Sequence, residues 1–225
     1  FAEAAAEVVL AHGIPVAIST TAVPTQMSSY EVVERGAAAG VVITASHNPK
    51  QYNGVKLGVG KTTMFGSDIT HIRDLAIKGQ FATGAGKTVK QDITEDYIAY
   101  LATKFKFSRK IKMVLDPANA TGALFAKRVF ERVGADVVSI YDTVDGNFPN
   151  HHPDPAKPEN LQDLIRALQE SDAEIGFAFD GDGDRLGVVT KDAQIIYPDR
   201  QLMLFAQDVL SRNPGAKVIY DVKST

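Results

Sequence analysis

The chain of 225 residues contains no cysteine, which excludes disulfide bonds and thiolate chemistry. It also lacks a run of about 18 apolar residues, the length that a transmembrane helix needs, and it shows no charged-then-apolar leader. Its formal net charge of −3 leaves no basic surplus of the kind that nucleic acid binding requires. These absences predict a cytoplasmic protein that binds neither nucleic acid nor membranes.

The overall composition is that of an ordinary globular protein, with 44% hydrophobic and 23% charged residues. Helical and strand periodicity alternate along the chain, which predicts an α/β fold. The predicted helices cover residues 2–12, 29–39, 67–78, 95–104, 122–133, 159–170 and 199–210. The predicted strands cover residues 15–18, 41–44, 111–115, 136–140, 175–179, 186–189, a segment that starts at 195, and 218–222.

A linker divides this alternation. Residues 79–86 are rich in Gly, Ala and Thr and show little apolar periodicity, as a connecting segment would. We therefore expect a first domain at residues 1–91 and a second at 92–194. Residues 195–225 would then begin a third domain that is cut short.

The most informative stretch is residues 177–185, where aspartates at alternate positions follow an apolar strand. Glycines between Asp180, Asp182 and Asp184 let the backbone curl, so that the three carboxylates can converge on one hard cation such as Mg²⁺. The plainer alternative is a solvated acidic turn. Apolar segments on both sides favour a tight connection between two strands instead.

Two other kinds of site space their acids in a similar way. An EF-hand loop would need Gly and Glu where this chain has Arg185 and Lys191, which excludes it. A haloacid-dehalogenase-type phosphatase also ends an apolar strand in Asp-x-Asp-Gly. It would use Asp180 as the nucleophile and Asp182 as the acid, and it stays open as the alternative function.

A second apolar strand, at residues 41–44, runs into a polar turn that presents Ser46 and His47. Pro49 disfavours helical dihedrals in the residue before it, so we expect this turn to be extended and exposed. The nucleophile elbow G-x-S-x-G is absent, which leaves acyl transfer with little support. With Lys56 nearby and an acidic loop elsewhere, phosphoryl transfer fits better, although an ordinary strand-to-turn connection would look the same.

Together these segments resemble the α-D-phosphohexomutase family. Thr-Ala-Ser-His-Asn-Pro at residues 44–49 and Tyr-Asn-Gly-Val-Lys at 52–56 are similar to its phosphoserine loop, and Asp-Gly-Asp-Gly-Asp-Arg at 180–185 is similar to its metal loop. Residues 144–155 and 197–200 resemble the bacterial phosphomannomutase/phosphoglucomutase branch. The resemblance implies mixed-sheet αβα domains and a cytoplasmic, monomeric isomerase that acts on phosphorylated hexoses.

The resemblance also implies a mechanism. In this family a serine gives its phosphoryl group to a hexose 1-phosphate or 6-phosphate and takes the other one back from hexose 1,6-bisphosphate, which is intermediate and activator. Ser46 would be this phosphoryl carrier. Its phosphate would hold Mg²⁺ together with Asp180, Asp182 and Asp184.

Four more residues receive roles by resemblance. Arg185 would fork onto the phosphate, and Lys56 would supply a point charge near the transferring group. His47 and Asn48 match the family's loop, which implies that they contact the phosphate or orient the serine.

Two loops of the family pattern do not occur in this chain. The family has four domains, with a sugar-selecting Gly-Glu-x-Ser-Gly-His loop in the third and a phosphate-binding loop in the fourth, and neither sequence is found here. The resemblance thus implies an interior fragment that is inactive alone, and it leaves the choice between mannose and glucose phosphates open. A sugar-phosphate binding module without catalysis is a third alternative.

Three further motifs are weaker. Residues 84–88 look like the end of a P-loop, but its first glycine and the preceding strand are missing, which argues against an ATP site. The adjacent His151 and His152 lack the spacing of converging zinc ligands. Residues 116–122 close a strand and open a helix, so this turn is either an anion site or a plain capped turn.

Overall fold

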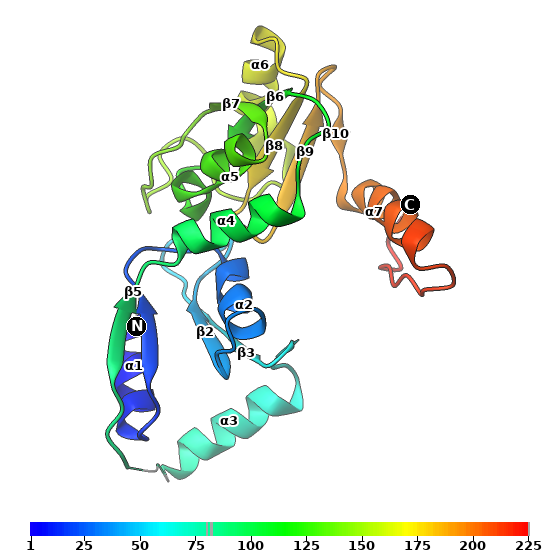
Figure 1. Cartoon of the computed structure of the whole chain (residues 1–225). Coiled ribbons are helices and arrows are strands. Elements are labelled where there is room, and N and C mark those ends of the chain that lie inside the picture. Colours follow the sequence, from blue (N-terminus) through cyan, green and yellow to red (C-terminus); the bar gives the residue numbers. More distant parts are fainter. Residues whose placement is uncertain (80, 82, 225) are drawn as a thin grey trace.

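The computed structural model describes residues 1–79, 81 and 83–224, and Figure 1 shows their course. Gln80 and Ala82, which belong to the predicted linker, lie outside the described residues. In this part of the chain, no helix has the length and apolar character needed to cross a membrane.

The described residues of the N-terminal half form three helices and five strands. Their order is α1 (Ala2–Ala11), β1 (Val16–Ser19), α2 (Thr25–Val33), β2 (Ala39–Ile43), β3 (Val55–Val59), β4 (Thr62–Thr63), α3 (Ser67–Lys78) and β5 (Thr88–Gln91). β1 pairs in parallel with β5, while β2, β3 and β4 form a separate antiparallel sheet in that order. Ile43 lies opposite Val55, so residues 44–54 form one connection at the end of the β2–β3 hairpin.

The C-terminal half alternates helices with the strands of one larger sheet. Its elements are α4 (Thr94–Lys104), β6 (Ile111–Asp116), the 3₁₀ helix η1 (Thr121–Leu124), α5 (Ala126–Arg132), β7 (Ala135–Ser139), the 3₁₀ helix η2 (Pro158–Leu161), α6 (Gln162–Glu170), β8 (Ile175–Phe179), β9 (Leu186–Thr190), β10 (Ile195–Ile196) and α7 (Pro198–Arg212). The strand order is β10-β9-β8-β6-β7. β7, β6 and β8 are parallel, whereas β9 and β10 run antiparallel to their neighbours.

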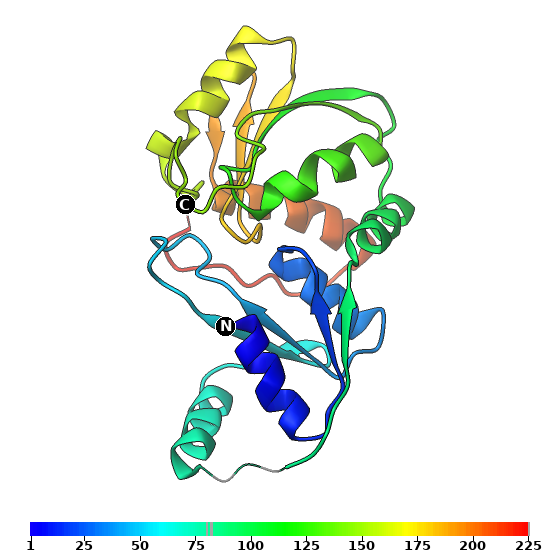
Figure 2. The same cartoon turned by 90° about the vertical axis from the view of Figure 1, so that its left-hand side faces the viewer.

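Strand β6 is buried on both faces, and its alternate residues belong to two different core layers. Val114 clusters with Leu164 and Leu168 of α6, whereas Met113 and Leu115 cluster on the side of α5. Each fully buried leucine contributes about 1.5–3 kcal/mol through its loss of contact with water. The sheet thus lies between two helical layers (Figure 2), which confirms the predicted mixed-sheet αβα fold.

The topology of this sheet brings two loops to the same edge. β8 and β9 form an antiparallel hairpin with Phe179 opposite Leu186, so residues 180–185 are its connection. β6 and β8 are parallel, so the turn after β6 lies beside that connection. Oγ1 of Thr121 in this turn donates a 2.9 Å hydrogen bond to the carbonyl oxygen of Gly181.

Most predicted elements form close to their predicted bounds, but the bounds predicted for the helix at residues 29–39 are wrong. It begins earlier, at Thr25, because Pro24 has the extended dihedrals that precede a helix. It ends at Val33, and Gly36 then takes a φ of +78°, which turns the chain into β2.

Other boundaries also differ from prediction. The predicted helix at 122–133 is interrupted at Phe125, whose φ of −140° separates η1 from α5. The helix predicted at 159–170 starts as the 3₁₀ turn η2. Residues 218–222 form no strand and are exposed, since no strand edge of the described chain pairs with them. Strands β3, β4 and β5 were not predicted.

Candidate active site

Ser46 and Asp180 meet where the two halves of the chain come together. The hydroxyl Oγ of Ser46 donates a hydrogen bond of 2.9 Å to Oδ2 of Asp180, which is fully buried. A Cβ added to Gly181 would lie 2.2 Å from the Ser46 carbonyl oxygen, so only glycine permits this approach. The predicted phosphoryl carrier therefore lies directly against the predicted metal loop.

We call residues 44–50 the serine turn, and it holds Ser46 in a strained conformation. The φ of Ser46 is +54°, in the left-handed region that residues other than glycine seldom occupy. Its N–H donates to Oγ1 of Thr44 at 2.8 Å, and Asn48 donates through N and Nδ2 to the carbonyl oxygen of Ala45. Such strain costs about 1–3 kcal/mol and persists only where surrounding contacts enforce it.

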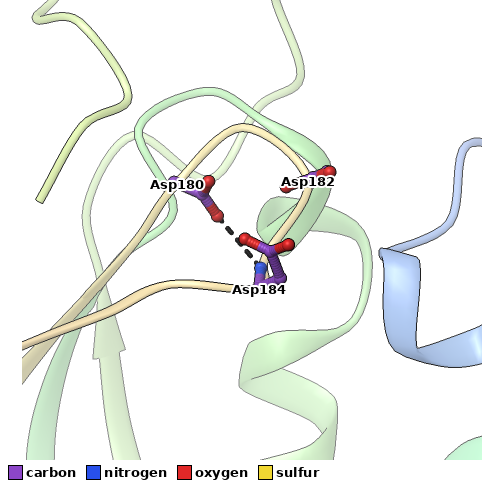
Figure 3. A group of neighbouring side chains, drawn as sticks. All are labelled: Asp180, Asp182 and Asp184. Atoms are coloured by element: carbon purple, nitrogen blue, oxygen red, sulfur yellow. Dashed lines mark hydrogen bonds between the residues drawn. The ribbon is translucent and has the colours of Figure 1, made fainter. Parts of the chain in front are cut away.

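We call residues 180–185 the acidic loop, and it closes on its first carboxylate. Oδ1 of Asp180 accepts hydrogen bonds from the backbone N–H groups of Asp184 and Arg185 at 3.0 and 3.1 Å. Figure 3 shows the first of these bonds between Asp180 and Asp184. One carboxylate oxygen from each of Asp180, Asp182 and Asp184 lies within 4.8 Å of the other two.

The two oxygens of Asp182 have different surroundings. Oδ2 accepts from Oγ1 of Thr25 at 2.9 Å, from Oγ1 of Thr44 at 3.0 Å and from Nζ of Lys56 at 2.7 Å. Oδ1 is buried and has no hydrogen-bond partner within the described part of the chain. A buried oxygen without a donor is costly, and a hard divalent cation would satisfy it. The three carboxylates therefore fit Mg²⁺.

Lys56 of β3 is the nearest counter-charge, with Nζ at 2.7 Å from Oδ2 of both Asp182 and Asp184. Burial alone would lower the pKa of the Lys56 ammonium, but its bonds to both carboxylates outweigh burial and raise that pKa. Burial raises the pKa of Asp180. For Asp182 burial acts in the same direction, but the hydrogen bonds to Oδ2 prevail and lower the pKa.

The other predicted site residues lie around Ser46 at different distances. Nδ1 of His47 is 3.2 Å from Ser46 Oγ, within hydrogen-bond reach. Asn48 lines an open pocket of about 240 Å³ beside Ser46. Arg185 has a side chain that is 45% exposed, and its Nε lies 3.9 Å from Oδ2 of Asp180, too far for a hydrogen bond. Its Nη1 lies at the same distance, 3.9 Å, from Oδ1 of Asp154. Because neither carboxylate holds it in a hydrogen bond, the guanidinium group can turn to an anionic ligand.

Three residues around the site were not predicted from the sequence. Thr25 opens α2 and donates both its hydroxyl and its N–H to Asp182. Thr44 bonds Asp182 as well as the backbone of the serine turn, and its place two residues before the serine could have indicated this. Lys50 lines the pocket and donates from Nζ to Oδ1 of Asn147 at 2.8 Å. The contacts of Thr25 and Lys50 join distant segments, so no local pattern signals them.

Two of the weaker motifs, the adjacent histidines and residues 84–88, form no sites of their own. His151 and His152 have different partners, the carboxylate of Asp116 and the carbonyl oxygen of His47. Among the described residues, only the acidic loop groups three potential metal-binding side chains of His, Cys, Asp or Glu. Residues 84–88 lead into β5 rather than into a helix, so they form no P-loop.

Known proteins are similar to this chain in both sequence and fold. A phosphoglucomutase of Neisseria gonorrhoeae is 53% identical over 205 residues, which cover 90% of this chain and 45% of the relative. A phosphomannomutase/phosphoglucomutase of Pseudomonas aeruginosa is 46% identical over 203 residues, which cover 90% of this chain and 44% of the relative. The crystal structure of a phosphoglucomutase/phosphomannomutase family protein from Burkholderia thailandensis superimposes with a TM-score of 0.91 at 46% identity, covering 99% of this chain and 50% of that one.

The chain spans about half the length of these relatives. Two family models match it in succession. The phosphoglucomutase/phosphomannomutase alpha/beta/alpha domain I matches residues 1–83, and domain II of the same family matches residues 95–193. Because these two domains account for most of the residues, the chain belongs to the phosphoglucomutase/phosphomannomutase family.

Proposed function

We propose that this chain supplies the phosphoserine and metal half of an enzyme that interconverts hexose 1-phosphates and hexose 6-phosphates. The observation that carries the proposal is the 2.9 Å hydrogen bond from Ser46 Oγ to Asp180, which joins a hydroxyl nucleophile to a cluster of carboxylates. The relatives named phosphoglucomutase and phosphomannomutase support it. Because the chain spans about half of those relatives, the remaining half would select the sugar.

Ser46 carries the phosphoryl group in this cycle. The bond between Ser46 Oγ and phosphorus breaks while a hydroxyl oxygen of the hexose monophosphate bonds to phosphorus, giving hexose 1,6-bisphosphate. The proton of that hydroxyl passes to Ser46 Oγ. In the second half-reaction the bond between the other phosphorus and its hexose oxygen breaks while that phosphorus bonds to Ser46 Oγ, and the serine proton passes to the freed hexose oxygen. Nδ1 of His47, at 3.2 Å from Oγ, would orient the serine during this exchange.

The remaining side chains would neutralise the charge of the phosphoryl group and hold it in position. Lys56 already lies against the acidic loop, so its ammonium group would stay beside the transferring phosphoryl oxygens. Arg185 would fork onto the same phosphate, and Asn48 would donate to it from the pocket wall. A Mg²⁺ ion held by the Ser46 phosphate and the aspartates of the acidic loop would withdraw charge from the phosphoryl oxygens.

The geometry gives less support to the two alternatives. In a haloacid-dehalogenase-type phosphatase, Asp180 would attack phosphorus. However, Oδ1 of Asp180 accepts two backbone N–H groups and its Oδ2 accepts the Ser46 hydroxyl, so both oxygens are engaged. A binding module without catalysis would have no use for a strained serine at this position.

A Ser46→Ala variant of the full-length protein tests the proposal. We expect interconversion of glucose 1-phosphate and glucose 6-phosphate to be lost, with thermal unfolding little changed. Ser211→Ala, on the exposed end of α7, serves as the matched control. Phosphatase activity that survives in Ser46→Ala and disappears in Asp180→Asn would instead establish the phosphatase.

The proposal also covers the organisation of the protein. We place a first domain at 1–91, a second at 92–194 and the beginning of a third at 195–225, which the two matched family domains support. Hexose 1,6-bisphosphate would act as activator, and the chain alone would be inactive because the sugar-selecting and C-terminal phosphate-binding loops are not in it. The monomeric state and the cytoplasmic location stay predictions.

A further inference from the structure

A loop of the C-terminal half contacts the serine turn at two points, and we call this loop, residues 145–153, the cross-loop. Nε2 of His152 lies 2.5 Å from the carbonyl oxygen of His47. Oδ1 of Asn147 accepts a hydrogen bond of 2.8 Å from Nζ of Lys50. The cross-loop therefore holds the serine turn directly after the serine and again at the end of the turn.

The cross-loop also forms part of the pocket beside Ser46. Gly146 and Phe148 line that pocket together with Ser46 and Asn48. Phe148 has a φ of +50°, so the cross-loop, like the serine turn, is held in a conformation that costs free energy. Two strained segments thus line the same pocket.

The base of the cross-loop is firmly attached to its own domain. Nε2 of His151 pairs with Oδ2 of Asp116 at 2.8 Å, and Asp116 is fully buried. Nδ2 of Asn150 donates to Oδ1 of Asn119 at 2.7 Å, and Asp145 donates its N–H to the Asn119 carbonyl oxygen at 2.9 Å. Since Asp116 ends β6 and Asn119 lies in the buried turn after it, the cross-loop is a fixed support for whatever it contacts.

The two adjacent histidines of the cross-loop bond to different parts of the molecule. The ring of His151 contacts the buried carboxylate of Asp116 through Nε2. Its Nδ1 lies 3.0 Å from the carbonyl oxygen of His152, and this contact restrains the backbone between the two histidines. His152 extends in the other direction, to the serine turn. A carbonyl oxygen can only accept, so Nε2 of His152 is the donor of this bond.

The bond to His47 bears directly on the geometry of Ser46. The carbonyl group of His47 belongs to the peptide between His47 and Asn48, so fixing it restrains the backbone directly after Ser46, whose φ is +54°. It also keeps the His47 ring where Nδ1 is 3.2 Å from Ser46 Oγ. Strained dihedrals persist only when their surroundings enforce them, and His152 is one of the groups that do so here.

We propose that His152 is a positioning residue, which acts through the carbonyl group of His47 to hold Ser46 in the conformation used for phosphoryl transfer. The catalytic part of this inference rests on the proposed function. The structural part, that His152 immobilises the serine turn, does not depend on it.

The structural part is tested by hydrogen exchange in the full-length protein, over peptides that cover the serine turn. His152→Ala removes the donor, whereas His152→Gln keeps an N–H group at a similar reach. His71→Ala, an exposed position on α3, is the control. We expect exchange in the turn to be about threefold to tenfold faster in His152→Ala, the scale of one lost hydrogen bond, and close to wild type in the other two. Equal exchange in His152→Ala and wild type would overturn the inference.

The catalytic part is tested with the same variants by steady-state kinetics. We expect kcat of His152→Ala to fall by about tenfold to a hundredfold, as misplacement of a reacting group by a fraction of a bond length does, with KM little changed. His152→Gln should recover most of kcat. Unchanged kcat in His152→Ala despite faster exchange would refute the catalytic role. If wild-type Ser46 accepts no phosphoryl group at all, the proposed function fails, while hydrogen exchange still decides whether His152 positions the turn.

Discussion

Nζ of Lys56 lies 2.7 Å from Oδ2 of Asp182, and this ion pair joins β3 of the N-terminal half to the loop that follows β8. The Asp182 side chain is only 4% exposed, so the pair is shielded from water on the aspartate side. The same ammonium group contacts Asp184 at 2.7 Å. The positive charge of one lysine therefore offsets the negative charges of two of the three clustered carboxylates. Without this lysine, the carboxylates would repel one another with no counter-charge between them.

Replacing Lys56 with Met should therefore destabilise the chain. Without Mg²⁺, we expect the free energy of unfolding to fall by about 1–3 kcal/mol, because the buried carboxylate of Asp182 loses a charged donor. Saturating Mg²⁺ should reduce the difference in free energy of unfolding between Lys56→Met and wild type, since the cation would bind the same carboxylates and neutralise their charge. Urea unfolding with EDTA and with Mg²⁺ measures both effects, and Lys78→Met at the exposed end of α3 is the control. Equal stability of Lys56→Met and wild type in EDTA would contradict the role of Lys56 as counter-charge.

Asp182→Asn should weaken Mg²⁺ binding by about tenfold or more while the fold stays intact, because one carboxylate charge leaves a shared cation site. Thr25 and Thr44 can still donate to the amide oxygen, which should preserve the local structure. Titration calorimetry gives the affinity and circular dichroism monitors the fold. Asp208→Asn, on the exposed face of α7, should bind Mg²⁺ like the wild type. An unchanged affinity in Asp182→Asn would remove that residue from the ligand set.

Gly181→Ala should displace the serine turn, because the new Cβ would meet the Ser46 carbonyl oxygen at 2.2 Å. We expect a loss of about 1–3 kcal/mol of stability, the usual cost of overpacking, together with slower phosphoryl transfer to Ser46. Gly58→Ala, in β3, has its nearest contact at 3.8 Å and controls for a general effect of adding a methyl group. Thermal unfolding and the rate of Ser46 phosphorylation are the measurements. Wild-type values for both would mean that the two loops are not in close contact.

The pair of His151 and Asp116 predicts how stability depends on pH. Burial lowers the pKa of His151, but the hydrogen bond and charge of Asp116 prevail and raise it above its usual value of 6.5. The stabilisation should then be complete below that value and be lost as the pH rises through the raised pKa. Tyr141, beside this ring, stays neutral because burial and Asp163 raise its pKa to about 12.

Urea midpoints of wild type and His151→Gln between about pH 5 and pH 9 test this prediction. The stability difference should be largest at the acidic end and shrink as the pH rises. The other four histidines occur in both proteins, so the difference isolates His151. A difference that stays constant across the range would show that His151 contributes no pH-dependent stability.

Much of the fold follows from local sequence. Apolar runs bounded by charged residues place β8 and β9 correctly, because such short apolar runs are typical of strands that pack into a core. The same locality makes the acidic loop predictable, since all three aspartates lie within one hairpin connection. Ser46 was predicted because an apolar strand ends a few residues before it.

Other features depend on contacts between distant segments. The pairing of β1 with β5 brings together residues 16–19 and 88–91, and the sequence of neither segment predicts this pairing. The start of α2 at Thr25 is tied to Asp182, far along the chain. The prediction of an extended, exposed turn is wrong at Ser46, which is half-buried and has a left-handed φ of +54°, because neighbouring elements impose a conformation that serine itself disfavours.

The most direct test of the central claim is peptide mass spectrometry across residues 41–56 of the full-length protein, after incubation with Mg²⁺ and a hexose 1,6-bisphosphate. Asp182→Asn serves as the control. We predict a phosphoryl group on Ser46 that is lost when hexose monophosphate is added, and much less of it in Asp182→Asn. An unmodified Ser46 with the label on Asp180 would contradict the account and establish the phosphatase, and no label on either residue would leave only a binding module.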